Sequence, residues 1–321
     1  MNVFKHIDEI DKACALALLE NPRGSWRELS LACKIPEKKL ARRINSLLEN
    51  QDICIVAELN PVMANQGITV HVWIEVVSGK ADHLAESLVQ LAEVRVLFLT
   101  TGQADLFVEV GLSKSTDISN WVNHHVRCNA DIKSVRTQVM LKPFTWAQHC
   151  KNKSDQSHLN SPQRQLSAEE RQLIDLLSVD ARLSIKYLSE QLQLSEHRTQ
   201  KMLSDLQAEG AYAIRMYLDP SLVGLNTECV VQINVQPQHA EQIALHLANL
   251  PHTRCLFGMN GESQIFWHVV CQDLSDLWQL TTEELGQLEG VISCNSNMVI
   301  GAYKRAGFMR KGLKLHFDQL I

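Results

Sequence analysis

Apolar positions over residues 7–48 recur at helical spacing, which predicts three short amphipathic helices. Ser25, followed by Glu28, has the spacing of a capping box at the start of the second helix. Pro36 fits the first position of the third helix, where its missing N–H group costs nothing. Helices joined by short turns in this way outline a helix-turn-helix. The apolar residues of the helical faces are Ile7, Ile10, Cys14 and Leu18, then Trp26, Leu29, Leu31 and Ala32, then Leu40, Ile44, Leu47 and Leu48.

Beyond these helices the spacing changes to that of strands. Residues 53–59 predict a strand pair or wing, so the first segment becomes a winged helix-turn-helix. The segment after Asn60 and Pro61 predicts the order strand, helix, strand, strand, helix, strand. This βαββαβ order is typical of a ferredoxin-like sandwich, in which two helices cover one face of four antiparallel strands. The ranges are 70–77, 81–92, 94–100, 104–111, 115–126 and 132–141.

The whole pattern occurs twice. Asn60 and Asp219, each followed by Pro, are 159 residues apart (219 − 60), and Gly102 and Gly261 show the same shift (261 − 102). The shift holds without gaps between copies at about 7–142 and 166–301. We therefore interpret the fold as α+β, with two tandem copies of a winged helix-turn-helix followed by a ferredoxin-like domain. Other superposed pairs are Ser25 with Ser184, Leu47 with Leu206, Val72 with Val231, Phe98 with Phe257 and Phe107 with Phe266.

The duplication predicts the domain boundaries. A winged helix-turn-helix is expected at 1–60 and 166–219, and a ferredoxin-like domain at 61–143 and 220–302. Residues 144–165 are polar and predict a linker, so we expect each copy to pack as a separate unit. The basic tail at 303–321 is expected to be a solvated extension, with contacts to DNA phosphates or to a neighbouring chain as alternatives.

Composition narrows the class of protein. With 321 residues, 45% of them hydrophobic and 21% charged, the chain is typical of a globular protein of two to four domains. No stretch approaches the ~18 uncharged apolar residues of a membrane span, so we expect no membrane partner and a cytoplasmic location. Nine scattered cysteines favour buried thiols over disulfides or a zinc site. The net charge of −5 excludes a uniformly basic coat but allows a local basic helix.

Copy one contains such a helix. Its third helix carries basic residues on about one face, opposite its apolar face, as a recognition helix in the major groove requires. In copy two the basic face is weaker, since Glu196, Asp205 and Glu209 offset its charge. Double-stranded DNA is therefore the predicted partner, with copy one supplying most of the affinity. The predicted DNA-binding residues are Lys34, Lys38, Lys39, Arg42 and Arg43 in copy one, and His197, Arg198 and Lys201 in copy two.

The sequence resembles the Lrp/AsnC family of leucine-responsive and asparagine-responsive regulators over nearly all of both copies. The family's helix pattern of Arg, an aliphatic residue and then Leu appears at Arg43, Ile44 and Leu47. Its Gly-x-x-Asp turn appears at Gly102 and Asp105. The resemblance implies a winged helix-turn-helix joined to a βαββαβ domain that dimerises, assembles further and binds small molecules, commonly amino acids.

Two features depart from the family. The usual member has one such unit, so this chain can imitate the family's dimer within one polypeptide. We expect at least a dimeric assembly, with ferredoxin-like domains pairing across chains or between the two copies. Copy two has Met202 where the family has Arg and Gln264 where it has Asp, which puts its DNA-binding and effector roles in doubt.

The resemblance implies an effector site near the Gly-x-x-Asp turn. Gly102 would allow close backbone approach, Asp105 could pair with an ammonium, and the neighbouring threonines could receive a carboxylate. The alternative is that Gly102 permits a tight hairpin and Asp105 caps it. The predicted effector-binding residues are Thr100, Thr101, Gly102 and Asp105, with Asn260 and Gly261 in copy two.

An enzyme is the alternative class. Decarboxylases of sirohaem-type tetrapyrroles share this fold, with histidines and basic residues in and beside the turn between strands two and three. Here the corresponding residues 98–105 and 257–264 contain neither His nor Arg. The adjacent His124 and His125 point about 100° apart on a helix and do not predict a metal site. We therefore expect a regulator without catalytic residues, metal or cofactor.

Overall fold

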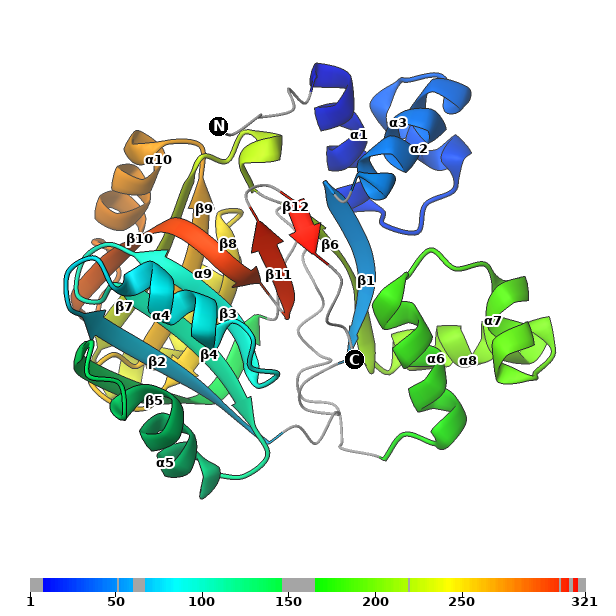
Figure 1. Ribbon diagram of the computed structural model, residues 1–321. Coiled ribbons are helices and arrows are strands. Elements are labelled where there is room, and N and C mark those ends of the chain that lie inside the picture. Colours follow the sequence, from blue (N-terminus) through cyan, green and yellow to red (C-terminus); the bar gives the residue numbers. More distant parts are fainter. Residues whose placement is uncertain are drawn as a thin grey trace. The chain divides into compact units, whose positions relative to one another are not determined.

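The computed structural model describes residues 8–50, 52–59, 67–145, 165–218, 220–305, 307–311 and 314–316. The chain divides into two compact units (Figure 1). The helical unit comprises residues 1–65, 154–223 and 312–315, and the sheet unit comprises 66–153, 224–311 and 316–321. The expectation that each copy packs separately is therefore wrong, because like domains of the two copies pack together.

The predicted helices of the helical unit are present in both copies. Ser25 and Glu28 form the predicted capping box, since each side chain accepts a hydrogen bond from the other's backbone N–H. Ser184 and Ser195 cap the second and third helices of copy two. Pro36 is the N-cap of the third helix and not its first residue, because the helix begins one position later. The helices are α1 (Glu9–Glu20), α2 (Trp26–Cys33) and α3 (Glu37–Glu49), and then α6 (Ala168–Val179), α7 (Ile185–Leu192) and α8 (Glu196–Ala208).

The wing is formed between the copies. Strand β1 (Ile53–Leu59) pairs antiparallel with β6 (Tyr212–Leu218), its counterpart in copy two. The prediction of a strand pair within each copy is therefore wrong. A lone strand leaves unpaired N–H and C=O groups along both edges, and here the equivalent strand of the other copy satisfies those along one edge.

The strands also complete the two helical cores. Met216 and Leu218 of β6 pack into the cluster around Leu18, Leu40 and Ile44 of copy one. Ala57 of β1 is buried with the helices of copy two. A group of three short helices buries little apolar surface, and the shared strands enlarge both cores. A short 3-10 helix, η3 (Pro220–Val223), follows β6.

The sheet unit contains the βαββαβ order twice. Its helices cover the outer face of the sheet, where each copy has its own apolar core (Figure 1). The elements of copy one are β2 (Ile68–Val76), α4 (Ala81–Leu88), β3 (Val94–Thr100), β4 (Leu106–Leu112), α5 (Asp117–Val122), the π-helical η1 (Asn123–Arg127) and β5 (Ile132–Thr145). Those of copy two are β7 (Thr227–Val235), η4 (Pro237–His239), α9 (Ala240–Ala248), β8 (Thr253–Met259), β9 (Ile265–Cys271), α10 (Leu274–Gln279), η5 (Leu280–Glu284) and β10 (Val291–Arg305), followed by β11 (Phe308–Lys311) and β12 (Lys314–His316).

The two sheets close on each other. Strand β5 pairs with β8 and β10 pairs with β3, so the strands form a continuous ring in the order β10-β3-β4-β2-β5-β8-β9-β7-β10. Pairing of ferredoxin-like domains between the two copies, one of the two expected arrangements, is therefore confirmed. The edge strands expected to recruit a second chain are instead paired within this one.

Aromatic side chains from both copies fill the space inside the ring. Phe107 and Phe266, equivalent positions, stack with ring centroids 5.2 Å apart, and Trp73 lies beside both. Two buried polar pairs lie among these rings, His71 with Glu109 and His268 with Glu228, along with Arg305, which also pairs with Glu228. The apolar part of this cluster consists of Trp73, Phe98, Ala104, Phe107, Val230, Phe257, Met259 and Phe266.

The beginning of the tail is integrated into the sheet unit. Strand β10 continues to Arg305, and the Lys304 ammonium donates to the carbonyls of Val89 and Leu91 beyond the end of α4. Tyr303 donates a 2.6 Å hydrogen bond to Asp82. The expectation of a solvated extension is wrong for this segment, because β10 continues through it and its residues 299–304 pair with β3. Residues 146–164, most of the predicted linker, lie outside the described residues.

The shared interior predicts a single unfolding transition for the sheet unit. Phe107→Ala should lower the free energy of unfolding by about 3–5 kcal/mol, because it leaves a cavity among aromatic residues of both copies. Leu141→Ala, at a side chain that is 67% exposed, is the control and should change stability by less than about 0.5 kcal/mol. Urea denaturation followed by tryptophan fluorescence measures both. Two separate transitions within the sheet unit, only one of them shifted by Phe107→Ala, would contradict the shared interior, whereas a separate transition of the helical unit would not.

Candidate functional site

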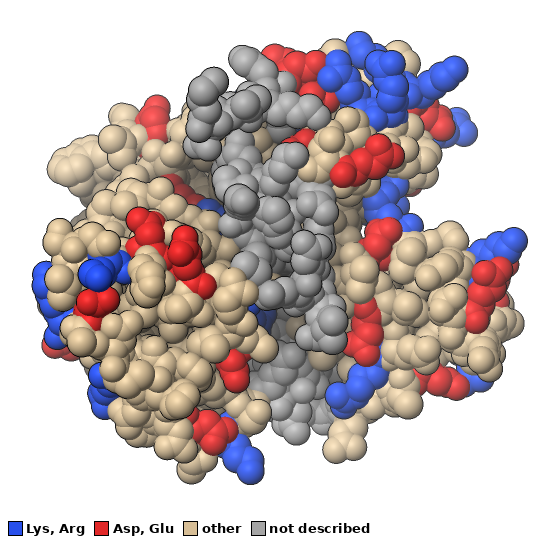
Figure 2. All heavy atoms as spheres, viewed as in Figure 1, with Lys and Arg blue, Asp and Glu red and all other residues tan. Residues whose placement is uncertain are grey.

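The recognition helix of copy one presents an exposed basic face. Lys38, Lys39 and Arg42 on α3 are exposed, as is Lys34 in the preceding turn, whereas Leu40 is completely buried. Figure 2 shows Lys and Arg side chains gathered over the α2–α3 region of Figure 1. The predicted division into a basic face and an apolar face is therefore present on this helix.

Arg43 is placed differently from the other predicted DNA-binding residues of α3. Its guanidinium forms ion pairs with Asp8 at 2.8 Å and with Asp11 at 3.1 Å, both at the start of α1. The backbone N–H of Asp11, together with Arg43, holds the pKa of the Asp8 carboxyl below its usual value. Arg43 therefore ties α3 to α1, a contact that sequence spacing on α3 alone does not reveal.

The equivalent face of copy two carries less free charge. His197 and Lys201 on α8 are exposed, but Arg198 forms a 2.7 Å ion pair with Glu169 of α6. Met202, the counterpart of Arg43, is half-buried against the helical core. In Figure 2 acidic side chains stand among the basic ones over this part of the helical unit.

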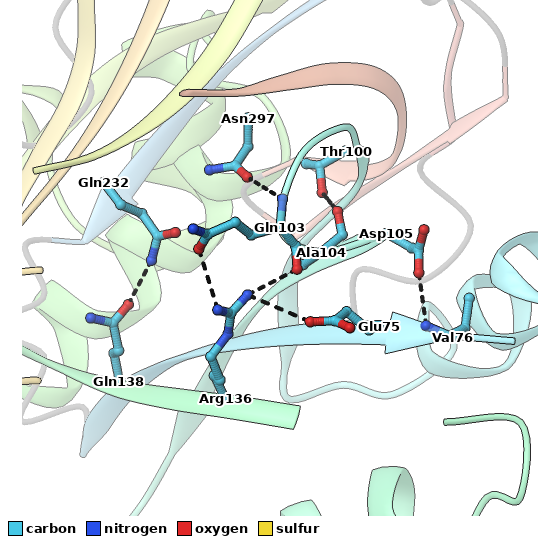
Figure 3. Close-up of polar contacts among 10 residues, drawn as sticks. All are labelled: Glu75, Val76, Thr100, Gln103, Ala104, Asp105, Arg136, Gln138, Gln232 and Asn297. Atoms are coloured by element: carbon cyan, nitrogen blue, oxygen red, sulfur yellow. Dashed lines mark hydrogen bonds and ion pairs between the residues drawn. The ribbon is translucent and has the colours of Figure 1, made fainter. Parts of the chain in front are cut away.

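The Gly-x-x-Asp turn of copy one borders a polar pocket. The backbone of Gly102 has φ +90°, which favours glycine, and the Asp105 carboxylate accepts a 2.8 Å hydrogen bond from the Val76 N–H (Figure 3). The pocket has a volume of about 520 Å³. Its lining residues are Glu75, Val76, Gly102, Gln103, Ala104, Asp105, Lys133 and Arg136.

The charged side chains of this pocket balance. Glu75 and Asp105 supply two carboxylates, and Lys133 and Arg136 supply two cations. Arg136 donates a 2.9 Å hydrogen bond to the Gln103 carbonyl and lies 4.0 Å from the Glu75 carboxylate (Figure 3). A pocket with both signs of charge suits a small ligand that also carries both.

Three further predicted effector residues, besides Asp105, have partners within the protein. Thr100 donates a 2.8 Å hydrogen bond to the Ala104 carbonyl inside the turn. Thr101 accepts one from the Met298 N–H of β10, and Asn260 accepts one from the Val139 N–H of β5. Thr101 and Asn260 are equivalent positions, so each joins its own turn to the last strand of the other copy.

A second equivalent pair strengthens this junction. Asn297 of β10 accepts a hydrogen bond from the Gln103 N–H (Figure 3). Gln138 of β5 donates to the carbonyls of Asn260 and Ser263. A Cβ atom on Gly102 would lie 2.8 Å from the Asn297 side-chain oxygen, closer than real contacts allow. Gly102 therefore allows the close approach of Asn297 from the other copy.

Copy two keeps the shape of the turn but not its charges. Gln264 stands where copy one has Asp105, and its side-chain oxygen likewise accepts from a strand N–H, that of Val235, at 2.9 Å. Gly261, with φ +96°, is the counterpart of Gly102. The 159-residue shift replaces Glu75, Lys133 and Arg136 by Asn234, Ile292 and Asn295.

Sequence reasoning missed Glu75, Lys133 and Arg136. They lie on strands and not in the turn that carries the family motif, and the pairing of β2 with β5 brings them beside it. The available signal was the loss of all of these charges at the equivalent positions of copy two.

Comparison with known proteins follows the same division of the chain. Residues 69–145 and 228–307 match the family model of the Lrp/AsnC ligand-binding domain. The chain belongs to the Lrp/AsnC family. Both matched segments of this Lrp/AsnC chain fall in the sheet unit, one in each copy.

Curated relatives align with slightly less than half of the residues of this Lrp/AsnC chain. An uncharacterized HTH-type transcriptional regulator of Pyrococcus horikoshii is 28% identical over 141 residues, which are 44% of this chain and 89% of that protein. The HTH-type transcriptional regulator FL11 of Pyrococcus furiosus is 27% identical over 137 residues, 42% of this chain and 90% of that protein.

One solved structure shares the fold of this Lrp/AsnC chain over nearly its full length. The siroheme decarboxylase NirDL superposes with a TM-score of 0.58 at 13% identity, covering 93% of each chain. This likeness establishes the tandem arrangement as a known fold. The described residues contain no group of three or more His, Cys, Asp and Glu placed to hold a metal ion, and no helix long and apolar enough to cross a membrane.

The turn contacts predict that Asp105 stabilises the fold through its hydrogen bond and not through its negative charge. Asp105→Asn should retain stability to within about 0.5 kcal/mol, because an amide oxygen accepts from the Val76 N–H as Gln264 does from Val235. Asp105→Ala should cost about 1–3 kcal/mol, because it leaves that N–H without its partner. Thermal and urea denaturation of the two variants test this. Equal destabilisation by both would show that the charge, and not the hydrogen bond, holds the turn.

Proposed function

We propose that this protein is a DNA-binding transcription regulator in which copy one supplies the main DNA-binding surface. The observation that carries the proposal is the exposed basic face of α3, formed by Lys38, Lys39 and Arg42 above a buried apolar face. A helix of this kind, third in a winged helix-turn-helix, has the shape and charge to enter a major groove. The names of the curated relatives support the same class of function.

The DNA contact residues follow from exposure. Lys34, Lys38, Lys39 and Arg42 are assigned to phosphates or base edges, and Arg43 to holding α3 on α1. In copy two, His197 and Lys201 are assigned to weaker contacts, with Arg198 partly engaged by Glu169.

Salt dependence tests this assignment. Each phosphate contact contributes about 0.9 to the slope of log binding constant against log salt. Lys39→Ala with Arg42→Ala should therefore flatten the slope by about 2, whereas Arg198→Ala with Lys201→Ala should flatten it by less than about 1. Fluorescence anisotropy with a labelled duplex measures the slopes. Salt is varied from about 50 to 300 mM, because affinity that depends on phosphate contacts falls steeply over this range.

The matched control removes the same charge from the sheet unit. Lys114→Ala with Arg127→Ala changes two exposed basic residues and should leave the slope unchanged. Equal flattening by all three double variants would mean that net charge, and not the α3 face, governs binding.

We further propose that the pocket of copy one is the effector site and that it binds the zwitterionic backbone of an amino acid. Glu75 and Asp105 suit the ammonium, and Lys133 with Arg136 suits the carboxylate. Copy two has no charge at the four corresponding positions, so each chain has a single site of this chemistry. Thr100, Thr101 and Asn260 act in the turn and the junction through their hydrogen bonds.

A panel of the common amino acids, screened by thermal shift and then by calorimetry, tests the effector proposal. At least one should raise the melting temperature and bind with one ligand per chain. Asp105→Asn should weaken that binding about tenfold or more, because a charge-assisted hydrogen bond to the ammonium is lost. Asp175→Asn, at an exposed aspartate of α6, should leave affinity unchanged. Two equivalent sites per chain, or unaltered affinity in Asp105→Asn, would contradict this assignment.

A tetrapyrrole decarboxylase is the second candidate, favoured by the full-length fold likeness to siroheme decarboxylase NirDL. Against it, the space inside the strand ring is occupied by packed side chains, where the buried His71, for example, packs against the rings of Phe107, Phe257 and Phe266. A large macrocycle would have to displace these rings to enter that space. Titration with an iron tetrapyrrole, followed by absorbance in the Soret region, separates the two: the regulator proposal expects no saturable spectral change.

A further inference from the structure

We propose that a single chain binds a two-part, non-palindromic DNA site in one direction, with α3 on the strong half and α8 on the weak half. The inference rests on the proposed function, since it assumes that the chain binds duplex DNA. It adds the form of the site, the number of chains on it and the direction in which they lie.

The helical unit has the internal symmetry of a dimer. In the β1–β6 pairing, Ile53 lies opposite Leu218, and Leu59 lies opposite Tyr212. The 159-residue shift carries Ile53 onto Tyr212 and Leu59 onto Leu218, so exchange of the two copies reproduces the same pairs. Val56 and Arg215, which are equivalent positions, face each other at the centre. A two-fold axis therefore relates the two strands.

Equivalent arginines make reciprocal contacts across the same junction. Arg182 donates to the carbonyls of Pro22 at 2.7 Å and Gly24 at 3.2 Å, and its guanidinium lies over the ring of Trp26, 4.6 Å from the centroid. Arg23, the counterpart of Arg182, donates to the Leu183 carbonyl at 3.2 Å. Each copy thus holds the turn between the first and second helices of the other.

These contacts fix α3 and α8 as the paired recognition helices of one chain. The two helical groups lie at opposite ends of the β1–β6 ribbon (Figure 1). Dimeric helix-turn-helix proteins present two such helices to half-sites about one helical turn apart. Here the second helix belongs to the same polypeptide, so a second chain is not needed to complete the pair.

The side chains on the two helices differ, although the backbones are equivalent. Lys34, Lys38, Lys39 and Arg42 become Gln193, His197, Arg198 and Lys201. Gln193 carries no charge, and Arg198 is paired with Glu169. The palindromy of an operator mirrors the symmetry of the side chains that read it. Unlike helices therefore select unlike half-sites, and the stronger helix determines which way the chain lies.

The first experiment uses one bound site recovered by selection from genomic DNA. Three duplexes are compared. One carries the complete site, and the other two keep the half that α3 contacts but are shortened on one side of it or on the other. Shortening on the α8 side should weaken binding severalfold, and shortening on the other side should not. Arg198→Ala with Lys201→Ala should abolish the difference between the two shortened duplexes. Sedimentation of the complex should give one chain per duplex.

The second experiment changes the preferred DNA site from a non-palindromic one to a palindrome. Gln193→Lys, His197→Lys, Arg198→Lys and Lys201→Arg together place the residues of the α3 face on α8, at exposed positions. This variant should prefer a palindrome of two strong halves over the natural site by about tenfold, which is about the effect of one mismatched base pair. The unaltered chain should show no such preference. Circular dichroism and melting temperature confirm that the variant folds.

The outcomes separate this inference from the proposed function. Failure of every duplex to bind would refute both. Specific binding with two chains per palindromic site, each through α3, would overturn the single-chain inference and keep the function. Equal loss on shortening either side would also overturn it, because the chain would then have no preferred direction.

Discussion

Antiparallel pairing of strand edges between the two copies is the interaction on which the rest of the structure depends. In the helical unit it joins β1 to β6, and in the sheet unit it joins β5 to β8 and β10 to β3. An edge strand exposes a row of unpaired backbone groups that will bind another strand if one is available. Duplication supplies that strand on the same polypeptide, at high effective concentration.

This pairing explains why the two copies could diverge in chemistry and not in shape. The contacts that join them occur in both directions, as with Thr101 and Asn260 or Arg23 and Arg182. A change on either side would weaken the junction. The exposed charges of the pocket and of α3 carry no such constraint, and copy two has lost most of them. Copy two therefore completes the structure while copy one retains the chemistry we assign to ligand and DNA.

Much of the fold could be predicted from the sequence, because apolar spacing reports directly on helices and strands. The repeat located the copies, and the order βαββαβ is present in each. Spacing shows which face of a strand is buried but not which strand lies beside it, so the division into a helical unit and a sheet unit was missed. The same limit explains why β10 was expected to end before residue 303.

The candidate sites could likewise be predicted only where they depend on a single element. The basic face of α3 could be predicted, since it depends on one helix. The role of Arg43 could not, because Asp8 and Asp11 belong to another helix. Asp105 was expected either to bind a ligand or to cap the turn, and its hydrogen bond from the Val76 N–H ties the turn to the end of β2. The charges on β2 and β5 that complete the pocket depend on strand register, which the sequence alone does not give.

Selection of bound fragments from genomic DNA by the purified chain tests the central claim most directly. The account predicts that the wild-type protein recovers a common site and that the variant carrying Lys39→Ala and Arg42→Ala does not. Failure to enrich any fragment at low salt would contradict DNA binding itself. Recovery of the same site by the variant would show that the protein reads DNA through a surface other than α3.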